Sequence, residues 1–189
     1  SGYAARTRET GQLADLTIDF SKTDRGSGAT KRMARNYERV PVDKNNTFSI
    51  TNSSKQIAKA ADVLSNGGVL NFAGHGNYGK LENVKQENLD KNVRDWLSEV
   101  VKSINQSGKK LTGEIITGGQ TGFDESFAKA AKDLNIPVKI IAPKGWVFRD
   151  KSGKDISDES LFKQRFLDTK KPTQATDKPK EPDKNKARI

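Results

Sequence analysis

The residues of this chain best suited to chemistry lie between Thr117 and Asp124, in the sequence Thr-Gly-Gly-Gln-Thr-Gly-Phe-Asp. Gly118, Gly119 and Gly122 let the backbone approach an anion closely, because glycine has no β-carbon. The apolar residues before this stretch predict a buried strand, and the spacing after it predicts a helix. A strand, a glycine turn and a helix start form a common phosphate site, since the first amides of the helix point at the anion. The alternative is an ordinary tight connection between strand and helix.

Polar side chains in and near this turn are candidates for direct roles. Gln120 and Thr121 lie within the turn, and the Thr121 hydroxyl either contacts the ligand or caps the helix. Asp124 and Glu125 follow in the first helical turn, where an acid offsets the helix dipole. We rank that role of Asp124 above catalysis, but keep both acids as candidate acid–base groups. His75, between two glycines, is a third such candidate, although a single histidine is more often structural.

Strand and helix patterns alternate along the chain. We expect helices at about 4–13, 28–36, 54–65, 87–105, 123–134 and 158–167, and strands at about 15–20, 39–43, 68–73, 113–117 and 138–142. This order predicts an α/β fold, a Rossmann-like three-layer sandwich with a mostly parallel sheet of about five strands. We expect one domain over residues 1–168. The basic segment 169–189, rich in lysine and proline, is expected to be disordered.

Loops that follow the predicted strands carry further candidate ligand contacts, because ligands of such sheets bind at the carboxyl ends of the strands. Gly26, Gly28 and Thr30 follow the first strand, and Gly74 follows the third. Lys144 follows the last strand and is a candidate charge partner for phosphate. Together with the glycine turn, these loops predict one anion or nucleotide site. The segment 146–166 predicts a hairpin and a capping helix over that site.

Composition narrows the function classes. The 189 residues contain no cysteine and one histidine, which excludes disulfides, thiolate metal sites and multi-histidine centres, so we predict no metal. No apolar run of about 18 residues exists, so we predict no membrane span. The net charge of +10 favours anionic partners, including non-specific nucleic acid. The chain starts at Ser1 and its only methionine is Met33, so we expect a processed product, a fragment or a chain cut from a tag.

Several segments resemble the molybdenum carrier family, a branch of the SLOG superfamily of Rossmann-like nucleotide-binding domains that is related to the LOG proteins. The resemblance rests on 117–124, Ala130-Ala131, Asn135-Ile136-Pro137 and Ala142-Pro143-Lys144-Gly145, and, from the other half of that family, on Tyr3-x-x-Arg6-Thr7, Ala14-Asp15-Leu16-Thr17, Gly26-Ser27-Gly28-Ala29-Thr30, Pro41-Val42-Asp43 and Leu70-Asn71-Phe72-Ala73-Gly74. Thr117 and Phe123 stand where the family has serine and valine. The two halves appear in swapped order, so the chain resembles a circular permutant over about residues 3–167.

The resemblance implies a nucleotide-type ligand across these loops, with Arg6 and Thr7 added to its contacts. It does not imply molybdenum, since the chain has no thiolate ligand. The LOG enzymes use a Gly-Gly-x-Gly-Thr-x-x-Glu loop for phosphoribohydrolase chemistry. The glycine spacing differs here, with Asp124 or Glu125 as the only nearby acids, which weakens the case for hydrolysis.

We therefore expect a module that senses, carries or sequesters a nucleotide or a nucleotide-derived phosphorylated molecule. The first alternative is a hydrolase that cleaves an N-glycosidic or phosphate bond of such a ligand, with Asp124 or Glu125 as acid or base. The second is a basic nucleic-acid-associated or packaged protein, cut from a larger polyprotein of phage or mobile-element origin. We expect a cytoplasmic location, and we name no cofactor beyond the nucleotide-type ligand. The oligomeric state is left open, with a dimer as one option.

Overall fold

A computed structural model of the chain describes residues 2–22, 28–77, 84–166 and 173–174. Gly26 and most of the segment 169–189 lie outside these residues. The helices are α1 (Gly2–Leu13), α2 (Gly28–Met33), α3 (Ser54–Ser65), α4 (Gln86–Gln106), α5 (Phe123–Asp133) and α6 (Glu159–Phe166), with 3₁₀ turns at Thr51–Ser53 and Lys144–Trp146 (η3). The strands are β1 (Leu16–Ser21), β2 (Tyr37–Pro41), β3 (Val69–Gly74), β4 (Glu114–Gly118), β5 (Val138–Ala142), β6 (Val147–Arg149), β7 (Asp155–Ser157) and β8 (Thr173–Gln174).

The main sheet is parallel throughout, in the order β2-β1-β3-β4-β5-β8. The chain leaves β1 toward β2 on one side and then returns to place β3 on the other side. The strand order therefore reverses between β1 and β3, which is the position where parallel sheets bind ligands. The α/β Rossmann-like fold expected from the sequence is confirmed. Thr173 and Gln174, within the segment expected to be disordered, pair with Ile141 and Ala142 as β8.

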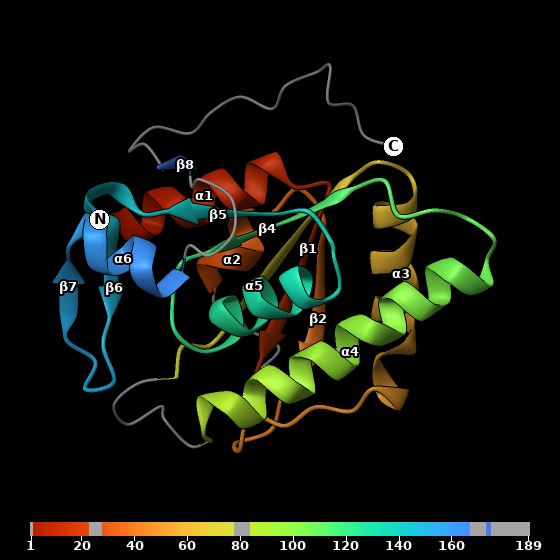
Figure 1. Cartoon of the computed structure of the whole chain (residues 1–189), viewed down its shortest axis with the longest axis horizontal. Coiled ribbons are helices and arrows are strands. Elements are labelled where there is room, and N and C mark those ends of the chain that lie inside the picture. Colours follow the sequence, from red (N-terminus) through yellow and green to blue (C-terminus); the bar gives the residue numbers. More distant parts are fainter. Residues whose placement is uncertain (1, 23–27, 78–83, 167–172, 175–189) are drawn as a thin grey trace.

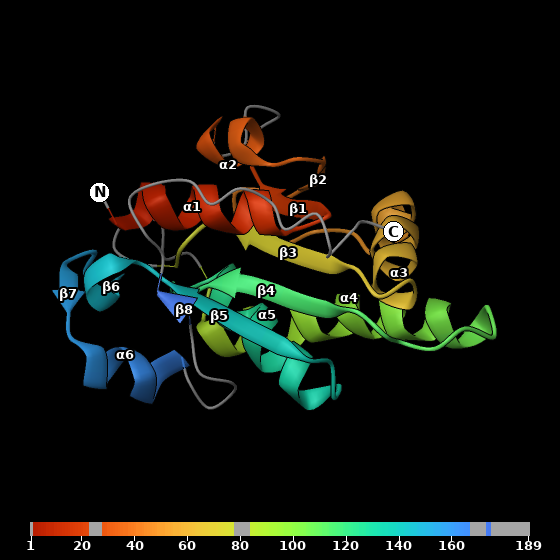
Figure 2. The same ribbon diagram turned by 90° about the horizontal axis from the view of Figure 1, so that it is seen from above.

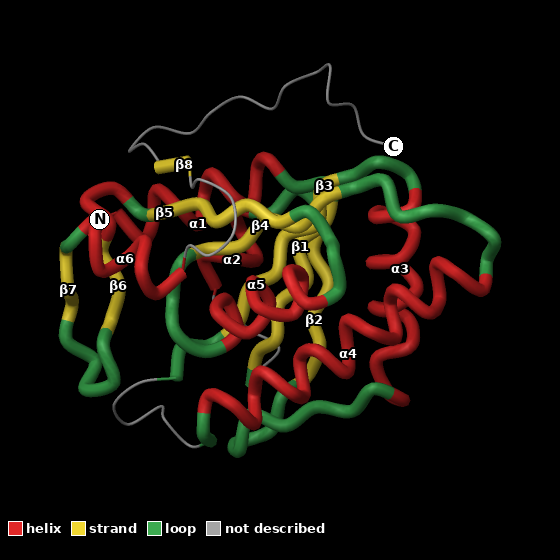
Figure 3. The backbone as a smooth tube through the Cα atoms, viewed as in Figure 1, coloured by secondary structure: helices red, strands yellow, loops and turns green. Residues whose placement is uncertain are grey.

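Helices cover both faces of this sheet. Figure 2 shows α1 and α2 on one face and α3, α4 and α5 on the other. Figure 1 places the β6–β7 hairpin and α6 together at one end of the molecule, beside the start of α1. The alternation of helix and strand can be followed along the backbone in Figure 3. Right-handed crossovers between parallel strands produce this layering, as the alternating sequence pattern predicts.

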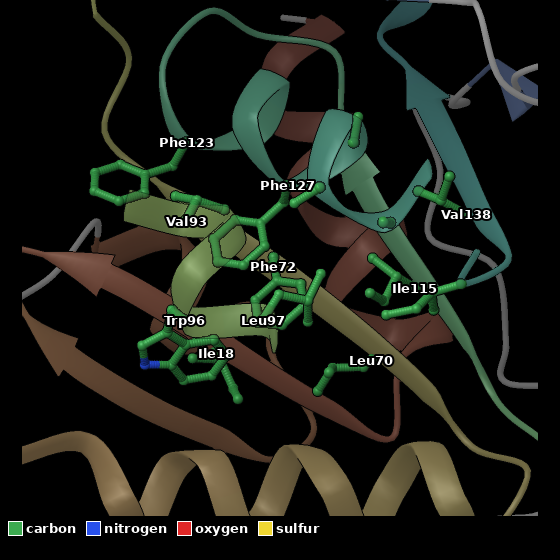
Figure 4. Packing of buried hydrophobic residues seen from close by; sticks show 14 of the residues in the cluster. Ile18, Leu70, Phe72, Val93, Trp96, Leu97, Ile115, Phe123, Phe127 and Val138 are labelled. Carbon is green, nitrogen blue, oxygen red and sulfur yellow. The ribbon is translucent and has the colours of Figure 1, made fainter. Parts of the chain in front are cut away.

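The face under α3, α4 and α5 holds an aromatic core (Figure 4). Phe72 and Phe127 stack with ring centroids 3.8 Å apart and an interplanar angle of 5°. Trp96 meets Phe20 edge to face at 5.2 Å, and its indole N–H donates to Ser53 Oγ at 3.1 Å. All four rings are at most 1% exposed. Burial of such large apolar surfaces is the main stabilising term of this face.

A smaller apolar cluster joins the hairpin to α6. Phe148 of β6 packs against Phe162 and Phe166 of α6, and all three are buried. The Asp158 carboxylate accepts from the backbone N–H of Leu161 at 3.0 Å, so Asp158 caps the first turn of α6. The predicted hairpin and following helix are therefore present, and they pack against the glycine turn.

Candidate functional site

On the sheet face under α1 and α2, the part formed by β1 and β3 is buried but polar. Thr17, Asp19 and Ser21 of β1 are each 1% exposed, and they alternate with residues that enter the aromatic core. Since successive side chains of a strand point to opposite faces, these three point away from that core. Asn71 of β3 belongs to the same face, where its Nδ2 donates to Thr17 Oγ1 at 3.2 Å. One strand thus separates an apolar core from a polar one.

A cavity of about 190 Å³ lies on this polar face, between α1, α2, the first turn of α5 and the ends of β3 and β4. Its lining consists of Arg6, Thr7, Thr10, Ala29, Thr30, Asn71, Phe72, Ala73, Gly74, Gly118 and Asp124. The cavity adjoins the place where the strand order reverses, next to β3. It is therefore in the position expected for a ligand of a parallel sheet.

Arg6 and Asp124 approach each other in this cavity at Gly118. A β-carbon on Gly118 would lie 2.7 Å from Arg6 Nε and 2.8 Å from Asp124 Oδ2, so a larger residue would displace both side chains. Arg6 Nη1 is buried and has no hydrogen-bond partner among the described residues. A buried donor without a partner is costly, and more so on a charged group. The cavity thus holds a cationic donor that an anionic group would satisfy.

Burial sets the protonation of this pair. It raises the pKa of Asp124 to about 7, while the nearby Arg6 charge and hydrogen bonding from Thr117 lower the pKa and Asp19 raises it. Burial also lowers the pKa of Arg6, and the negative charge of Asp124 opposes that change. Arginine nevertheless keeps its charge in proteins. Near neutral pH, therefore, Arg6 is a fixed cation and Asp124 exchanges a proton.

The threonines of α1 present acceptors to the cavity. The Thr7 hydroxyl donates to the carbonyl oxygen of Tyr3 at 2.9 Å, one helical turn earlier. The Thr10 hydroxyl has the carbonyl oxygens of Arg6 and Thr7 within reach, both at 3.1 Å. Because each hydroxyl has one hydrogen, its oxygen is left as an acceptor. The cavity therefore combines one strong cationic donor with several acceptors.

The glycine turn between β4 and α5 is closed by hydrogen bonds within the protein. Its amides donate as follows: Thr121 to Gln120 Oε1 at 3.0 Å, Gly122 to Gln86 Oε1 at 3.0 Å, Phe123 to the His75 carbonyl at 3.3 Å, and Glu125 to the Gln120 carbonyl at 3.1 Å. The sequence predicted amides that donate to an anion, whereas these four amides already donate to acceptors within the protein. An anion inside this turn would have to displace its acceptors. The polar cavity, on the other side of Gly118, instead holds a buried donor, Arg6 Nη1, without a hydrogen-bond partner among the described residues.

Two of the predicted ligand-binding glycines serve packing. A β-carbon on Gly119 would lie 2.1 Å from Phe162 Cζ, so Gly119 admits the ring of α6. Gly122 has φ +92°, and a β-carbon there would lie 2.4 Å from the His75 carbonyl oxygen. Both glycines allow the turn to touch its neighbours, and neither lines the cavity. Gly118 is the glycine of this turn that borders the cavity.

The other predicted acid–base residues are bound to structural partners. Glu125 lies 3.3 Å from both Lys129 Nζ and Arg165 Nη2, within the α5–α6 contact. His75 Nε2 accepts from the Lys22 backbone N–H at 3.1 Å, and burial lowers the His75 pKa, with the Lys22 charge acting in the same direction. The imidazole is thus neutral and braces the loop after β1. Of the three candidates, Asp124 alone lines the cavity.

The remaining predicted contacts divide between the cavity and other places. Arg6, Thr7, Thr30 and Gly74 line the cavity together with Gly118 and Asp124. Gly28 begins α2 beside Arg32, and Gln120 and Thr121 belong to the closed turn. Lys144 is exposed in η3, where its carbonyl oxygen would lie 2.7 Å from a β-carbon on Gly2. Gly26 lies outside the described residues.

Sequence reasoning missed two polar cavity residues, Asn71 and Thr10. A usable signal was present in Asp-Leu-Thr-Ile-Asp-Phe, where polar residues alternate with apolar ones in a central strand. Such a strand is covered on both faces in an α/β sheet, so its polar side chains must be buried. Buried polar groups need partners, which points to a polar site on that face.

The comparisons with known proteins do not identify a relative, because no family model, curated protein or solved structure matches the chain. Within the described ranges, no group of three or more histidine, aspartate or glutamate side chains is arranged to hold a metal ion. None of the helices in the described part of the chain has both the length and the apolar character needed to cross a bilayer.

Proposed function

We propose that the cavity between α1, α2 and the ends of β3 and β4 binds a nucleotide or a nucleotide-derived phosphorylated small molecule. The observation that carries this proposal is the buried Arg6 Nη1, which lacks a hydrogen-bond partner among the described residues and belongs to a cavity-lining side chain. A phosphate oxygen would satisfy this donor, and a guanidinium suits phosphate through its planar fork. The resemblance of the Tyr3-x-x-Arg6-Thr7 segment to the nucleotide-binding SLOG domains supports the same ligand class.

The cavity size and its acceptors limit how such a ligand fits. A volume of about 190 Å³ is below the roughly 300–1,000 Å³ of pockets that enclose drug-sized ligands. The phosphate end of a nucleotide therefore lies inside, and the base lies toward the opening. Hydroxyl groups of the ligand can donate to Thr7, Thr10 or ionised Asp124. Protonated Asp124 avoids repulsion with a phosphate at Arg6 and can donate to it.

A thermal-unfolding panel tests this proposal. Mono-, di- and cyclic nucleotides and inorganic phosphate would be added to wild-type protein, Arg6→Met and Arg94→Met. Arg94 lies 3.6 Å from Asp133 on the far side of the sheet, so its substitution is a matched control for the loss of one arginine. A ligand at 100 times its Kd stabilises by about 2.7 kcal/mol, which is a rise of about 5–10 °C for this chain length. We expect the rise in wild type and Arg94→Met, and its loss in Arg6→Met. A rise in Arg6→Met equal to that of wild type would contradict the proposal.

One observation favours hydrolysis of the bound ligand as a second candidate. Asp124 lines the cavity beside Arg6, and burial raises its pKa to about 7, where a carboxyl group can both give and take a proton. A general acid at this position would protonate the leaving group, which is adenine if water attacks the ribose at the N-glycosidic bond, or the ribose 5′-oxygen if water attacks phosphorus, while Arg6 holds the phosphate. Incubation of AMP with the protein, followed by chromatography for adenine and ribose 5-phosphate or for adenosine and inorganic phosphate, tests this role. Product formation that is lost in Asp124→Asn would support it, and binding without product would exclude it for AMP.

A further inference from the structure

We propose that Tyr3 is a positioning residue that holds Arg6 in the cavity, and that the β6–β7 hairpin acts on the ligand site through it. The inference deepens the proposed function and rests on it, since Arg6 is taken as the anion-binding group. The Arg6 guanidinium carbon lies 5.4 Å from the centre of the Tyr3 ring, within the range of a cation–π contact. Tyr3 and Arg6 are three residues apart on α1 and therefore share a face of the helix.

Arg6 needs such a support because its guanidinium is not held by hydrogen bonds at every nitrogen. Its Nη1 has no hydrogen-bond partner among the described residues. An arginine side chain loses considerable rotamer freedom when it is held in one place. The Tyr3 ring lies against the guanidinium, and Gly118 has no β-carbon that would occupy the same space. These two neighbours define the position of the Arg6 side chain. A guanidinium that is already held in place loses less conformational entropy when a ligand binds, so the affinity is higher.

Tyr3 is in turn held by the hairpin. Its hydroxyl donates to Asp155 Oδ1 at 3.0 Å, and Asp155 lies on β7. The Arg149 guanidinium of β6 also lies over the Tyr3 ring, at 5.1 Å, and its Nε is 3.4 Å from Asp155 Oδ1. Burial and the hydrogen bond to Asp155 raise the pKa of Tyr3 to about 12, so the hydroxyl keeps its proton. The ring orientation is therefore fixed from outside the cavity.

The hairpin is tied to the glycine turn by Gln120. The Gln120 side-chain oxygen accepts from the Arg149 backbone N–H at 3.1 Å and from the Thr121 backbone N–H at 3.0 Å. A continuous set of contacts thus runs from the turn through β6 and Tyr3 to Arg6. This assigns the predicted turn residue Gln120 a role one step removed from the ligand.

The test uses Tyr3→Leu and Tyr3→Phe in the whole chain. Leucine keeps helix propensity and apolar bulk but has no ring, whereas phenylalanine keeps the ring and loses only the bond to Asp155. Leu13→Ala, at the other end of α1, is the control for a general loosening of the helix. The first readout is the pKa of Asp124 by carbon NMR, without ligand and assigned with Asp124→Asn. The second is the affinity for AMP by calorimetry.

We expect Tyr3→Leu to raise the Asp124 pKa by about one unit, because the Arg6 charge that lowers this pKa is no longer held nearby. We expect the AMP affinity of Tyr3→Leu to fall about tenfold. Tyr3→Phe should move both readouts in the same direction but by less, because it keeps the ring and loses the hydrogen bond by which the hairpin holds it. Leu13→Ala should stay near wild type in both readouts. If Tyr3→Phe equals wild type, the hairpin does not act through the Tyr3 hydroxyl. If Tyr3→Leu lowers the melting temperature but leaves the Asp124 pKa unchanged, Tyr3 only packs α1 and the inference is wrong. If the Asp124 pKa rises in Tyr3→Leu but AMP binds neither wild type nor any variant, the positioning of Arg6 by Tyr3 is supported and the proposed function fails.

Discussion

Both faces of the sheet bury side chains, but one buries aromatic rings and the other buries polar groups. Under α3, α4 and α5, Phe72, Trp96 and Phe127 fill the space with rings in direct contact. Under α1 and α2, Asp19 and Asn71 are also buried, but beside them lies a cavity with an arginine donor that has no partner in the described part of the chain. The first face stabilises the fold, whereas the burial of polar groups on the second face lowers the stability of the fold. Residues that lower stability in this way are candidates for a functional role.

The largest expected effect lies on the apolar face. Phe127→Ala removes a fully buried ring that stacks on Phe72, and should lower the free energy of unfolding by about 3–5 kcal/mol in urea denaturation. Leu161→Ala is the control, because Leu161 is 44% exposed and should change stability by less than about 0.5 kcal/mol. Equal effects of both substitutions would remove the contrast between core and surface on which the comparison depends.

On the polar face, Asp124 should make stability fall with rising pH. Its folded pKa of about 7 exceeds the ordinary value of 3.8, so the folded state holds the proton more tightly. This contribution is complete below about pH 4 and is lost as pH rises through about 7, a change of up to about 4 kcal/mol. Asp124→Asn should remove it, so the stability of wild type relative to the variant should decrease over this range. An increase with pH would mean that Arg6 is fully paired with Asp124 and needs no ligand.

The adjacent glycines of the turn should separate packing from binding. A β-carbon on Gly119 would overlap the Phe162 ring, so Gly119→Ala should cost about 1–3 kcal/mol of stability. A β-carbon on Gly118 would meet Arg6 and Asp124, which can swing away at the ends of their side chains. Gly118→Ala should therefore reduce AMP binding more than it reduces stability. Urea denaturation and calorimetry on both variants check this, and the opposite pattern would move the anion site back into the glycine turn.

The smallest effect is expected at His75. His75→Ala removes the acceptor of the Lys22 N–H and should cost about 1 kcal/mol at pH 7.5. Because burial lowers the pKa of His75, its contribution is complete above the ordinary value of 6.5 and is lost as pH falls through the folded value. The stability difference between wild type and variant should therefore shrink in acid. If His75 were catalytic, His75→Ala would instead abolish any turnover of AMP and would change stability little.

Most of the fold could be predicted from the sequence. Polar and apolar residues alternate along β1, which is the period of a strand. Leu89, Val93 and Trp96 recur on α4 with the period of a helix. Each period identifies the type of its element. Strand β8 was missed because two residues in a lysine- and proline-rich segment carry no periodic signal. Their pairing with β5 depends on a tertiary contact that the local sequence does not encode.

The site was predictable only in part. The sequence placed Arg6, Gly118 and Asp124 among the candidates, because they stand at strand ends or in recognisable motifs. It did not show that Gln86, 36 residues before Gly122, occupies the amide of that glycine. Nor did it show that Phe162 fills the space beside Gly119. Both contacts join distant segments, so a glycine turn cannot be assigned as a phosphate loop from its own residues.

The central claim is that Arg6 Nη1, which no described residue pairs by a hydrogen bond, receives an anion. Calorimetry of AMP binding tests this claim most directly. Wild type, Arg6→Met and Arg94→Met would be titrated at pH 6, where Asp124 is mostly protonated. We predict binding to wild type and Arg94→Met, and a loss of about 10- to 100-fold in Arg6→Met, as expected for a hydrogen bond to a charged group. Equal affinity of Arg6→Met and wild type, or no binding of AMP to wild type, would contradict the claim.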